Sequence, residues 1–437
     1  MKEIRGHISP FIIAIVCMLC LGSCIYDNYP DGENETNTGM GGREDQTLIV
    51  LHISPLDATN TLTNTPIEKI KSLRIIILNE SSIECNRLIA FSETSPATAA
   101  YFQYVFTWIT EPGKKRIYLI ANENSVAELK YNNPQNNLPT DLPTSLTALF
   151  ERYAEIEKDE TEQDDDVTVK KPNAEEFKNV MEAVYFAPDY ENKAGAIFLP
   201  YTSYYDVKTE KEEHLNQTMY LVPVATKFTF KFINNRTSGV QVNGISITKT
   251  NTNNFLFANM DESEINMRFA DDDKDYYWID WLAKVAEESH KNQSSVGANE
   301  AFNEKYGWIK YYKMPPLTST DEFVESKFVE SANSQTVPAE GTLDLGPFYV
   351  PESRYERTYE DAKGTVKEQI YGLTLELDDS RIQFDDVPIS NLKALFRNTS
   401  VVITITMSEG DVEIYAEIQG WNRKSANGWV TEGQDPN

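Results

Sequence analysis

The stretch that decides the fold class reads Val401-Val-Ile-Thr-Ile-Thr-Met-Ser-Glu-Gly-Asp-Val-Glu-Ile-Tyr-Ala-Glu-Ile418. Apolar and polar residues alternate up to Met407, a Ser-Glu-Gly-Asp turn follows, and the alternation resumes at Val412. Because successive side chains of a β-strand point to opposite faces, this period of two predicts an antiparallel hairpin with one buried face. Half-buried antiparallel strands are typical of a β-sandwich.

The same pattern recurs toward the N-terminus. Phe228, Phe230 and Phe232 share one face of a predicted strand. Between residues 240 and 247 the alternation changes phase at Gly244, where we predict a β-bulge. Short runs rich in β-branched and aromatic residues predict four earlier strands, at residues 47–54, 72–78, 103–109 and 116–121.

Helices are expected as insertions into this β pattern. Two groups of residues recur at helical spacing, Leu146, Leu149, Phe150 and Tyr153 in one and Phe177, Val180, Met181 and Val184 in the other. Asn173 and Glu176 stand where a capping box would begin the second helix, and a third helix is expected over residues 278–287. The predicted fold class is therefore mainly β with a few inserted helices.

The chain is long enough for about two domains with cores of their own. Val222-Pro223 directly precedes the strongest predicted strand of the 437-residue chain. We place a boundary there, which gives β-sandwich domains over residues 47–222 and 223–437.

The N-terminus has the three parts of an export signal: basic residues at Lys2 and Arg5, an uncharged apolar run over residues 11–21, and small residues before Cys24. The run is about half the length that a membrane-spanning helix requires. The ending Leu21-Gly-Ser-Cys24 resembles the lipobox of bacterial lipoproteins, in which the cysteine sulfur receives a diacylglycerol. The resemblance implies that residues 1–23 are a signal peptide and that Cys24 is lipidated. The alternatives are an ordinary cleaved signal peptide and a buried helix with a coincidental cysteine.

Residues 24–46 are predicted to form a flexible tether, because they are rich in Asn, Asp, Glu, Gly and Thr and offer almost nothing to bury. The whole chain carries 68 acidic and 40 basic residues, a net charge of −28, which repels phosphate backbones and argues against nucleic-acid binding. Of the four cysteines, only Cys85 remains once the signal is removed and Cys24 is acylated, so no intramolecular disulfide is expected.

A search for catalytic motifs indicates no enzyme activity and no cofactor. His52, His214 and His290 share no helix turn, and the sequence contains no His-Glu-x-x-His, Gly-x-Ser-x-Gly, Walker or dinucleotide-binding motif. Two acidic clusters, residues 164–166 and residues 271–273 with Asp275, lack the glycine and the distal glutamate of a calcium loop. We interpret both clusters as solvated loops and predict no metal site.

The order of several short motifs resembles that of the fimbrillins, lipoproteins of Bacteroidales that build surface fimbriae. After the lipobox and the tether, these motifs are Thr47-Leu-Ile-Val-Leu-His-Ile-Ser54, Ser72-Leu-Arg-Ile-Ile-Ile-Leu-Asn79, Arg116-Ile-Tyr-Leu-Ile-Ala-Asn-Glu123, Tyr220-Leu-Val-Pro-Val-Ala-Thr-Lys-Phe228, Phe348-Tyr-Val-Pro-Glu352 and Ile418-Gln-Gly-Trp421. The resemblance implies two transthyretin-like β-sandwich domains and a structural protein without enzyme activity. It also implies that a precursor anchored in the outer membrane loses its first strand to an Arg- or Lys-specific protease. A neighbouring subunit of the extracellular fimbrium then donates a strand to the vacated groove.

On this chain the strand to be removed is residues 47–54. The candidate processing sites are the basic residues that follow it, Lys69, Lys71 and Arg74, because no Arg or Lys lies between residues 55 and 68. The tail after Trp421 is polar, which leaves residues 401–419 as the donor strand. Both departures from the family pattern fit an anchor or tip subunit about as well as a stalk subunit. The expected partners are other fimbrial subunits, the outer membrane through the lipid on Cys24, and receptors on host or bacterial surfaces.

Two other functions fit the composition. A lipid-anchored glycan-binding protein of a nutrient-uptake system is also built of β-sandwiches, and 23 Tyr and 6 Trp would suit stacking on sugars. A surface hydrolase would use a pair of carboxylates, whose separation in space a sequence does not give. Exposed aromatic residues on one face would favour the glycan-binding protein, whereas an apolar groove under the first strand would favour the fimbrial subunit.

Overall fold

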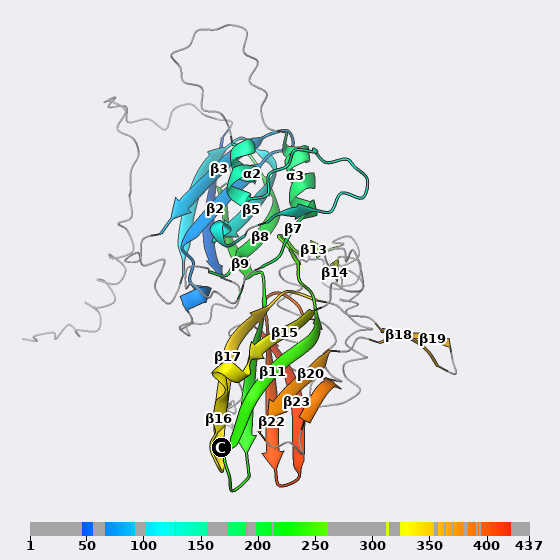
Figure 1. The fold of residues 1–437 in the computed structure, drawn as a ribbon. Helices are drawn as coiled ribbons and strands as arrows, with labels where there is room; N and C mark the ends of the chain where they lie inside the picture. The colour runs from blue at the N-terminus through cyan, green and yellow to red at the C-terminus, as the bar shows by residue number, and fades with distance from the viewer. Residues whose placement is uncertain are drawn as a thin grey trace, which may run out of the picture. The chain divides into compact units, whose positions relative to one another are not determined.

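The computed structural model describes the chain from Gln46 to Gly420, with gaps at residues 56–65, 92–101, 127, 155–172, 189, 191–197, 212–213, 261–311, 314–323, 354–356, 362–363, 369–370, 379–382, 390–391 and 393–394. The described part is mainly β, with two α-helices and several sheets (Figure 1). The predicted fold class, a mainly β fold of sandwich type, is confirmed.

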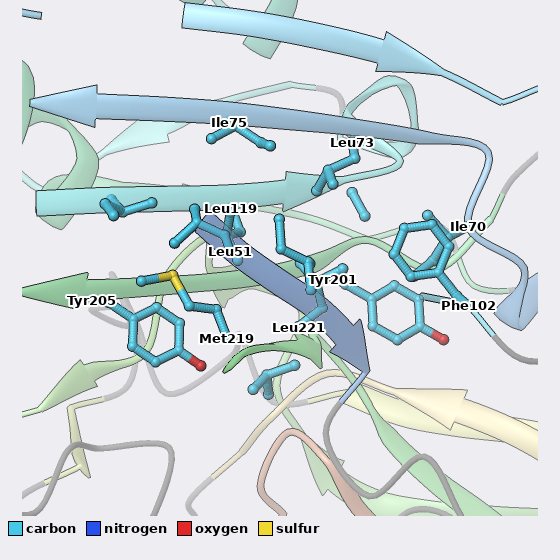
Figure 2. Close-up of a cluster of buried hydrophobic side chains, with 14 of the residues drawn as sticks. Leu51, Ile70, Leu73, Ile75, Phe102, Leu119, Tyr201, Tyr205, Met219 and Leu221 are labelled. Atoms are coloured by element: carbon cyan, nitrogen blue, oxygen red, sulfur yellow. The ribbon is translucent and has the colours of Figure 1, made fainter. Parts of the chain in front are cut away.

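The largest sheet has seven strands in the order β3-β2-β5-β8-β9-β1-β4. We call it the first sandwich, because its two groups of strands, β3-β2-β5-β8 and β9-β1-β4, contribute side chains to one shared core. Its strands are β1 (Thr47–Pro55), β2 (Ser72–Leu78), β3 (Ile83–Ala90), β4 (Tyr104–Thr110), β5 (Gly113–Ala121), β8 (Tyr201–Thr209) and β9 (His214–Pro223). Residues 214–221 of β9 pair with β1, whereas Val222 and Pro223 pair with β8. Side chains from both groups of strands, among them Leu51, Leu119 and Met219, meet in one core (Figure 2).

The run Ile75-Ile-Ile-Leu78 of β2 is buried throughout. Alternate residues of this run face the core of the first sandwich, and the others pack under helices α2 (Leu146–Arg152) and α3 (Ala174–Ala183). A strand that is covered on both faces needs an uninterrupted apolar run, which explains why this segment does not alternate.

Both helices form where they were predicted. The side-chain oxygen of Asn173 accepts hydrogen bonds from the backbone N–H groups of Glu175 and Glu176 at 2.9 and 3.3 Å, so Asn173 caps α3 as expected. The carboxylate of Glu176 accepts a hydrogen bond from the Tyr153 hydroxyl at 2.7 Å. The third predicted helix, residues 278–287, lies outside the described residues.

Two further sheets face each other across a second core, and we call them the second sandwich. One has the order β17-β10-β22-β23, and the other has the order β15-β11-β20-β21 with β16 also paired to β11. Their strands are β10 (Thr226–Asn234), β11 (Val240–Thr250), β15 (Val324–Val329), β16 (Gln335–Val337), β17 (Gly341–Val350), β20 (Gly372–Leu377), β21 (Gln383–Pro388), β22 (Thr399–Ser408) and β23 (Asp411–Gly420).

Three sequence predictions for the second sandwich are confirmed. Phe228, Phe230 and Phe232 of β10 are fully buried in its core. The register between β11 and β20 shifts at Gly244. A Cβ atom at this position would stand 2.9 Å from a carboxylate oxygen of Glu376, so a residue without a Cβ suits the bulge. Strands β22 and β23 form the hairpin, and Gly410 in its turn has a φ of 84°, a conformation that favours glycine.

Short pairings complete the described part: β6 (Lys130–Tyr131), β7 (Val184–Phe186) and β12 (Asn254–Phe255) in one sheet, β13 (Asn259–Met260) with β14 (Tyr312–Lys313), and β18 (Arg357–Asp361) with β19 (Gly364–Glu368). Pro223 is the last residue of β9 and Thr226 the first of β10, so the strands change sheet at the predicted boundary. That residues 47–222 and 223–437 are separate domains stays a prediction.

Candidate assembly site

Strand β1 lies within the largest sheet rather than at its edge. It pairs antiparallel with β4 on one side and parallel with β9 on the other. Its alternating sequence places Ile49, Leu51 and Ile53 in the core, each no more than 1% exposed, and Leu51 lies among side chains of the neighbouring strands (Figure 2). Burying an aliphatic side chain of this size stabilises a fold by about 1.5–3 kcal/mol. Withdrawal of β1 would therefore expose apolar surface and remove the strand that pairs with β4 and with residues 214–221 of β9.

The segment that follows β1 is held by Asn122, which stands at the end of β5 in the left-handed conformation with a φ of 57°. Its side-chain amide donates hydrogen bonds to the carbonyl oxygens of Lys69 at 2.9 Å and Leu199 at 2.7 Å. Its side-chain oxygen accepts a hydrogen bond from the backbone N–H of Lys71 at 2.8 Å. The Ala-Asn pair that ends this strand thus fixes the backbone around the first predicted processing site.

The three candidate processing residues lie in different environments. Lys69 is exposed. Lys71 is half-buried, with its ammonium group 5.5 Å from the centre of the Phe198 ring. Arg74 lies within β2, where its buried guanidinium donates to both carboxylate oxygens of Glu123 at 2.5 and 2.8 Å.

Glu68 connects this segment with the second sandwich. It ends the short 3-10 helix Pro66–Glu68, and its side chain is 1% exposed. One carboxylate oxygen accepts hydrogen bonds from Lys227 Nζ at 3.1 Å and from the Tyr349 hydroxyl at 2.8 Å, and these two residues are cross-strand neighbours on β10 and β17. Burial lowers the pKa of Lys227, and the Glu68 carboxylate opposes that shift.

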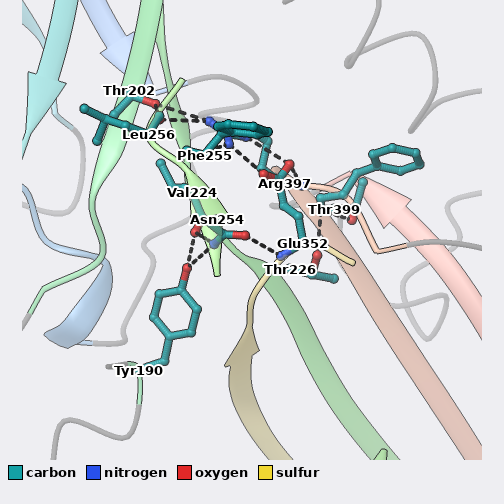
Figure 3. Close-up of polar contacts among 11 residues, drawn as sticks. Tyr190, Thr202, Val224, Thr226, Asn254, Phe255, Leu256, Glu352, Arg397 and Thr399 are labelled. Atoms are coloured by element: carbon teal, nitrogen blue, oxygen red, sulfur yellow. Dashed lines mark hydrogen bonds and ion pairs between the residues drawn. The ribbon is translucent and has the colours of Figure 1, made fainter. Parts of the chain in front are cut away.

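A second charged contact between the sandwiches is fully enclosed (Figure 3). Arg397 and Glu352 are 0% and 1% exposed at their side chains, and the guanidinium donates to the two carboxylate oxygens at 2.9 and 2.6 Å. The remaining N–H groups donate to the carbonyl oxygens of Phe255 at 2.7 Å and Leu256 at 3.2 Å and to Oγ1 of Thr202 at 3.3 Å. A buried charge is tolerated only when it is paired and hydrogen-bonded in this way.

Asn254 extends this network toward the end of the first sandwich (Figure 3). Its amide nitrogen donates to the carbonyl oxygen of Val224 at 3.0 Å and to the Tyr190 hydroxyl at 2.9 Å, and its oxygen accepts from the backbone N–H of Glu352 at 2.7 Å. The Tyr190 hydroxyl also donates to the Val224 carbonyl. Burial, reinforced by the negative charge of Glu352, raises the pKa of Tyr190, which keeps this hydroxyl a donor.

The other residues considered from the sequence lie apart from these contacts. His52 on β1 and His214 on β9 are exposed, and Cys85 is a buried thiol whose pKa burial raises to about 12. Within the described residues no group of three or more His, Cys, Asp or Glu could hold a metal ion, and no helix is long and apolar enough to cross a membrane. Cys24, His290 and both acidic clusters lie outside the described residues.

Sequence reasoning missed both charged contacts. Glu68 and Lys227 are far apart in the chain, and so are Glu352 and Arg397. In an acidic sequence nothing distinguishes the charged residues that are buried from those that are exposed. One signal was present, because the motif Phe348-Tyr-Val-Pro-Glu352 ends on the carboxylate that binds Arg397.

Comparisons with known proteins found no family model and no curated protein that matches the chain. Solved structures do match. The tip fimbrial protein Mfa3 from Porphyromonas gingivalis with C-terminal truncation is 11% identical with a TM-score of 0.42, and the match covers 86% of this chain and 100% of that one. A fimbrilin from Porphyromonas gingivalis W83 is 11% identical with a TM-score of 0.40, covering 86% and 98%. A fimbrial assembly protein from Parabacteroides distasonis ATCC 8503 is 11% identical with a TM-score of 0.35, covering 86% and 98%. All three are named as fimbrial proteins.

Proposed function

We propose that the protein is a structural subunit of a cell-surface fimbrium, exported as a lipoprotein and assembled by β-strand exchange. The observation that carries the proposal is the position of β1, which is paired on both sides and buries three aliphatic side chains. Loss of such a strand leaves unpaired backbone groups and an apolar slot, and a strand from another subunit satisfies both. The order of the fimbrillin-like motifs supports the same function.

The lipid and β1 belong to one piece of chain in this proposal. Cys24 carries the lipid at the outer membrane, and residues 24–46 lead from it directly into β1. A cut beyond β1 frees the subunit from the membrane together with its first strand. A subunit that is not cut stays attached and serves as the anchor of the fimbrium on the extracellular face.

We place the cut after Lys69. It is the first basic residue beyond β1, and its side chain is exposed. The N–H of Lys71 is bound by Asn122, and Arg74 lies in a strand that pairs with β3 and β5. The carbonyl of Lys69 is also bound, by the Asn122 amide, so Lys69 is favoured over the other two candidates by its exposed side chain and its place outside any strand.

The donor strand in this proposal is β23. Within the described part of the chain it pairs with β22 alone and ends its sheet, so it leaves without breaking a second described ladder. Val412, Ile414 and Ala416 alternate along it, as the inward residues of β1 do, and each is buried or half-buried. This alternation suits a slot built to receive every second side chain.

A glycan-binding function has less support. Such a protein stacks sugars on exposed aromatic residues that share one face. Among the described residues, Tyr415 is the one aromatic side chain that is counted as exposed. Most other aromatic rings in the described part pack in the cores, as the ring contacts around Phe177 and Phe328 illustrate.

The test uses the full chain and a protease that cuts after Lys. We expect a fragment ending at Lys69 and, after it leaves, ladders of oligomers that survive SDS. Lys69→Gln should abolish both, whereas Lys208→Gln, at a lysine that is 69% exposed on β8, should change neither. A clean cut at Lys69 that releases β1 yet yields only monomers would overturn strand exchange. Retention of the lipid and of an uncut Lys69 in cells would assign the anchor role.

A further inference from the structure

The first sandwich ends on one side in β4, and this edge strand is uncharged. Among the residues that the structure describes, β4 pairs with β1 along one side only and stands last in the strand order. Its sequence, Tyr104-Val-Phe-Thr-Trp-Ile-Thr110, contains no charged residue and no proline. Proteins ordinarily protect an edge strand with charged side chains or proline, because its unpaired N–H and C=O groups are a template for another strand. β4 has neither kind of protection.

The other strands that end a large sheet do carry charged residues or proline. These strands and their protecting residues are β3 with Glu84 and Arg87, β17 with Asp344 and Pro347, β23 with Asp411, Glu413 and Glu417, β15 with Glu325 and Lys327, and β21 with Asp385, Asp386 and Pro388. The contrast is sharpest within one sheet, because β3 and β4 end the same seven strands.

The outward face of β4 is also apolar. Val105 and Ile109 are 54% and 53% exposed, and Thr107 between them is exposed as well. On the adjacent β1, Leu48 lies opposite Ile109 and Val50 lies opposite Thr107, and both are half-buried. The exposed surface therefore continues from the edge strand onto its neighbour without a charge.

This surface is complementary to itself. If two copies of β4 pair antiparallel with Thr107 opposite Thr107 of the second copy, Val105 lies opposite Ile109 of that copy. Pairs of β-branched residues that face each other across strands stabilise a sheet. Two chains with a net charge of −28 repel each other, so they are expected to meet where each is uncharged.

We propose that β4 is a docking edge for a second copy of this chain, joined through an antiparallel β4–β4 pairing centred on Thr107. The pairing makes one continuous sheet from two first sandwiches and is two-fold symmetric, as most interfaces between identical chains are. It uses the side of β4 that faces away from β1, so it requires β1, or a donated strand in its place, to hold β4 in the sheet.

Cysteine cross-linking tests the register. In the full chain with Cys17, Cys20 and Cys24 changed to serine, Thr107→Cys should form a disulfide-linked dimer under mild oxidation. Residues directly opposite in an antiparallel pair have Cα atoms about 4.5–5.5 Å apart, which a disulfide spans. Cys85 is buried with a raised pKa and does not interfere.

Two single variants are the matched controls. Val105→Cys should cross-link to itself at least about tenfold less, because two Val105 residues would be about 13 Å apart along the strands. A mixture of Val105→Cys and Ile109→Cys chains should link to each other. Leu88→Cys, at an exposed apolar position on the protected edge β3, should not form the dimer.

A second measurement needs no cysteine. Sedimentation of the full chain should show a concentration-dependent dimer that Ile109→Lys abolishes and Leu88→Lys leaves intact, with both variants retaining the parent β-sheet circular dichroism. A monomer at all concentrations, or equal cross-linking of Thr107→Cys and Leu88→Cys, would overturn the proposal. Large irregular aggregates in place of a dimer would also overturn it, because they would show an unspecific apolar edge.

Discussion

The two charged contacts between the first and second sandwiches differ in what surrounds them and in where they lie along the chain. Arg397 and Glu352 are enclosed, and the partners named above for Arg397 all lie beyond Lys69 in sequence. Glu68 lies just before Lys69, and its partner Lys227 is 13% exposed at the side chain. A cut after Lys69 would therefore place Glu68 on the departing piece and leave the Arg397 contact whole. If the chain is cut there, the Arg397 contact is permanent and the Glu68 contact is removable.

The largest effect is expected from breaking the permanent contact. Arg397→Met leaves the Glu352 carboxylate buried without its cation and removes the guanidinium bonds to the carbonyl oxygens of Phe255 and Leu256, of which Leu256 keeps a bond from the Thr202 hydroxyl. Removal of one partner of such a pair costs about 3–5 kcal/mol. Urea unfolding followed by tryptophan fluorescence should show this loss, and a stability within error of the parent protein would contradict the account.

Breaking the removable contact should cost less. Glu68→Gln keeps an acceptor for the Tyr349 hydroxyl but leaves Lys227 without its carboxylate. We expect a loss of about 2–3 kcal/mol, because Lys227 can still reach some water. Lys227→Met should partly restore stability in the double variant, and strictly additive losses would show that the two side chains are not coupled.

Removal of a neutral donor to the same carboxylate should have a smaller effect. Tyr349→Phe deletes a hydroxyl that donates to Glu68 at 2.8 Å while Lys227 remains in place. The expected loss in the free energy of unfolding is about 1 kcal/mol. In the Glu68→Gln background the same substitution should cost less still, which a double-mutant cycle measures.

An ion pair at the surface is expected to contribute least to stability among the contacts compared. The carboxylate of Asp386 binds Lys249 Nζ at 2.8 and 2.9 Å, and both side chains are partly exposed. Although partial burial acts to raise the pKa of Asp386, hydrogen bonds from Lys249 and Thr248 lower it overall. Its contribution is therefore present above the pKa of the unfolded chain, near 4, and is lost as the pH falls through the lower folded value.

Asp386→Asn should consequently cost at most about 1 kcal/mol at pH 7 and nothing at pH 2. Unfolding curves of parent and variant at the two pH values measure the difference. An equal loss at both would show that the side chain acts through its shape rather than through its charge.

Local patterns were enough to predict many elements of this fold. The alternation of phenylalanines in β10, the change of phase at Gly244 and the β22–β23 hairpin each depend on residues close in sequence, and each is confirmed. The order of strands in the sheet could not be predicted in this way, because nothing near β1 in the sequence indicates that it pairs with both β4 and β9. Arg397 likewise binds Thr202 and Leu256, which lie 195 and 141 residues away in the chain.

The parallel pairing of β1 with β9 also has a consequence for the order of folding. If the chain is exported from its N-terminus, as proposed above, β1 is delivered first, whereas its parallel partner β9 follows β2, β3, β4, β5 and β8 in sequence. Closing so long a loop between β1 and β9 is entropically costly and slow, so the other strands of the sheet are expected to pair before β1 pairs with β9. The ladder between the first strand of the chain and β9 is therefore expected to be among the last to form.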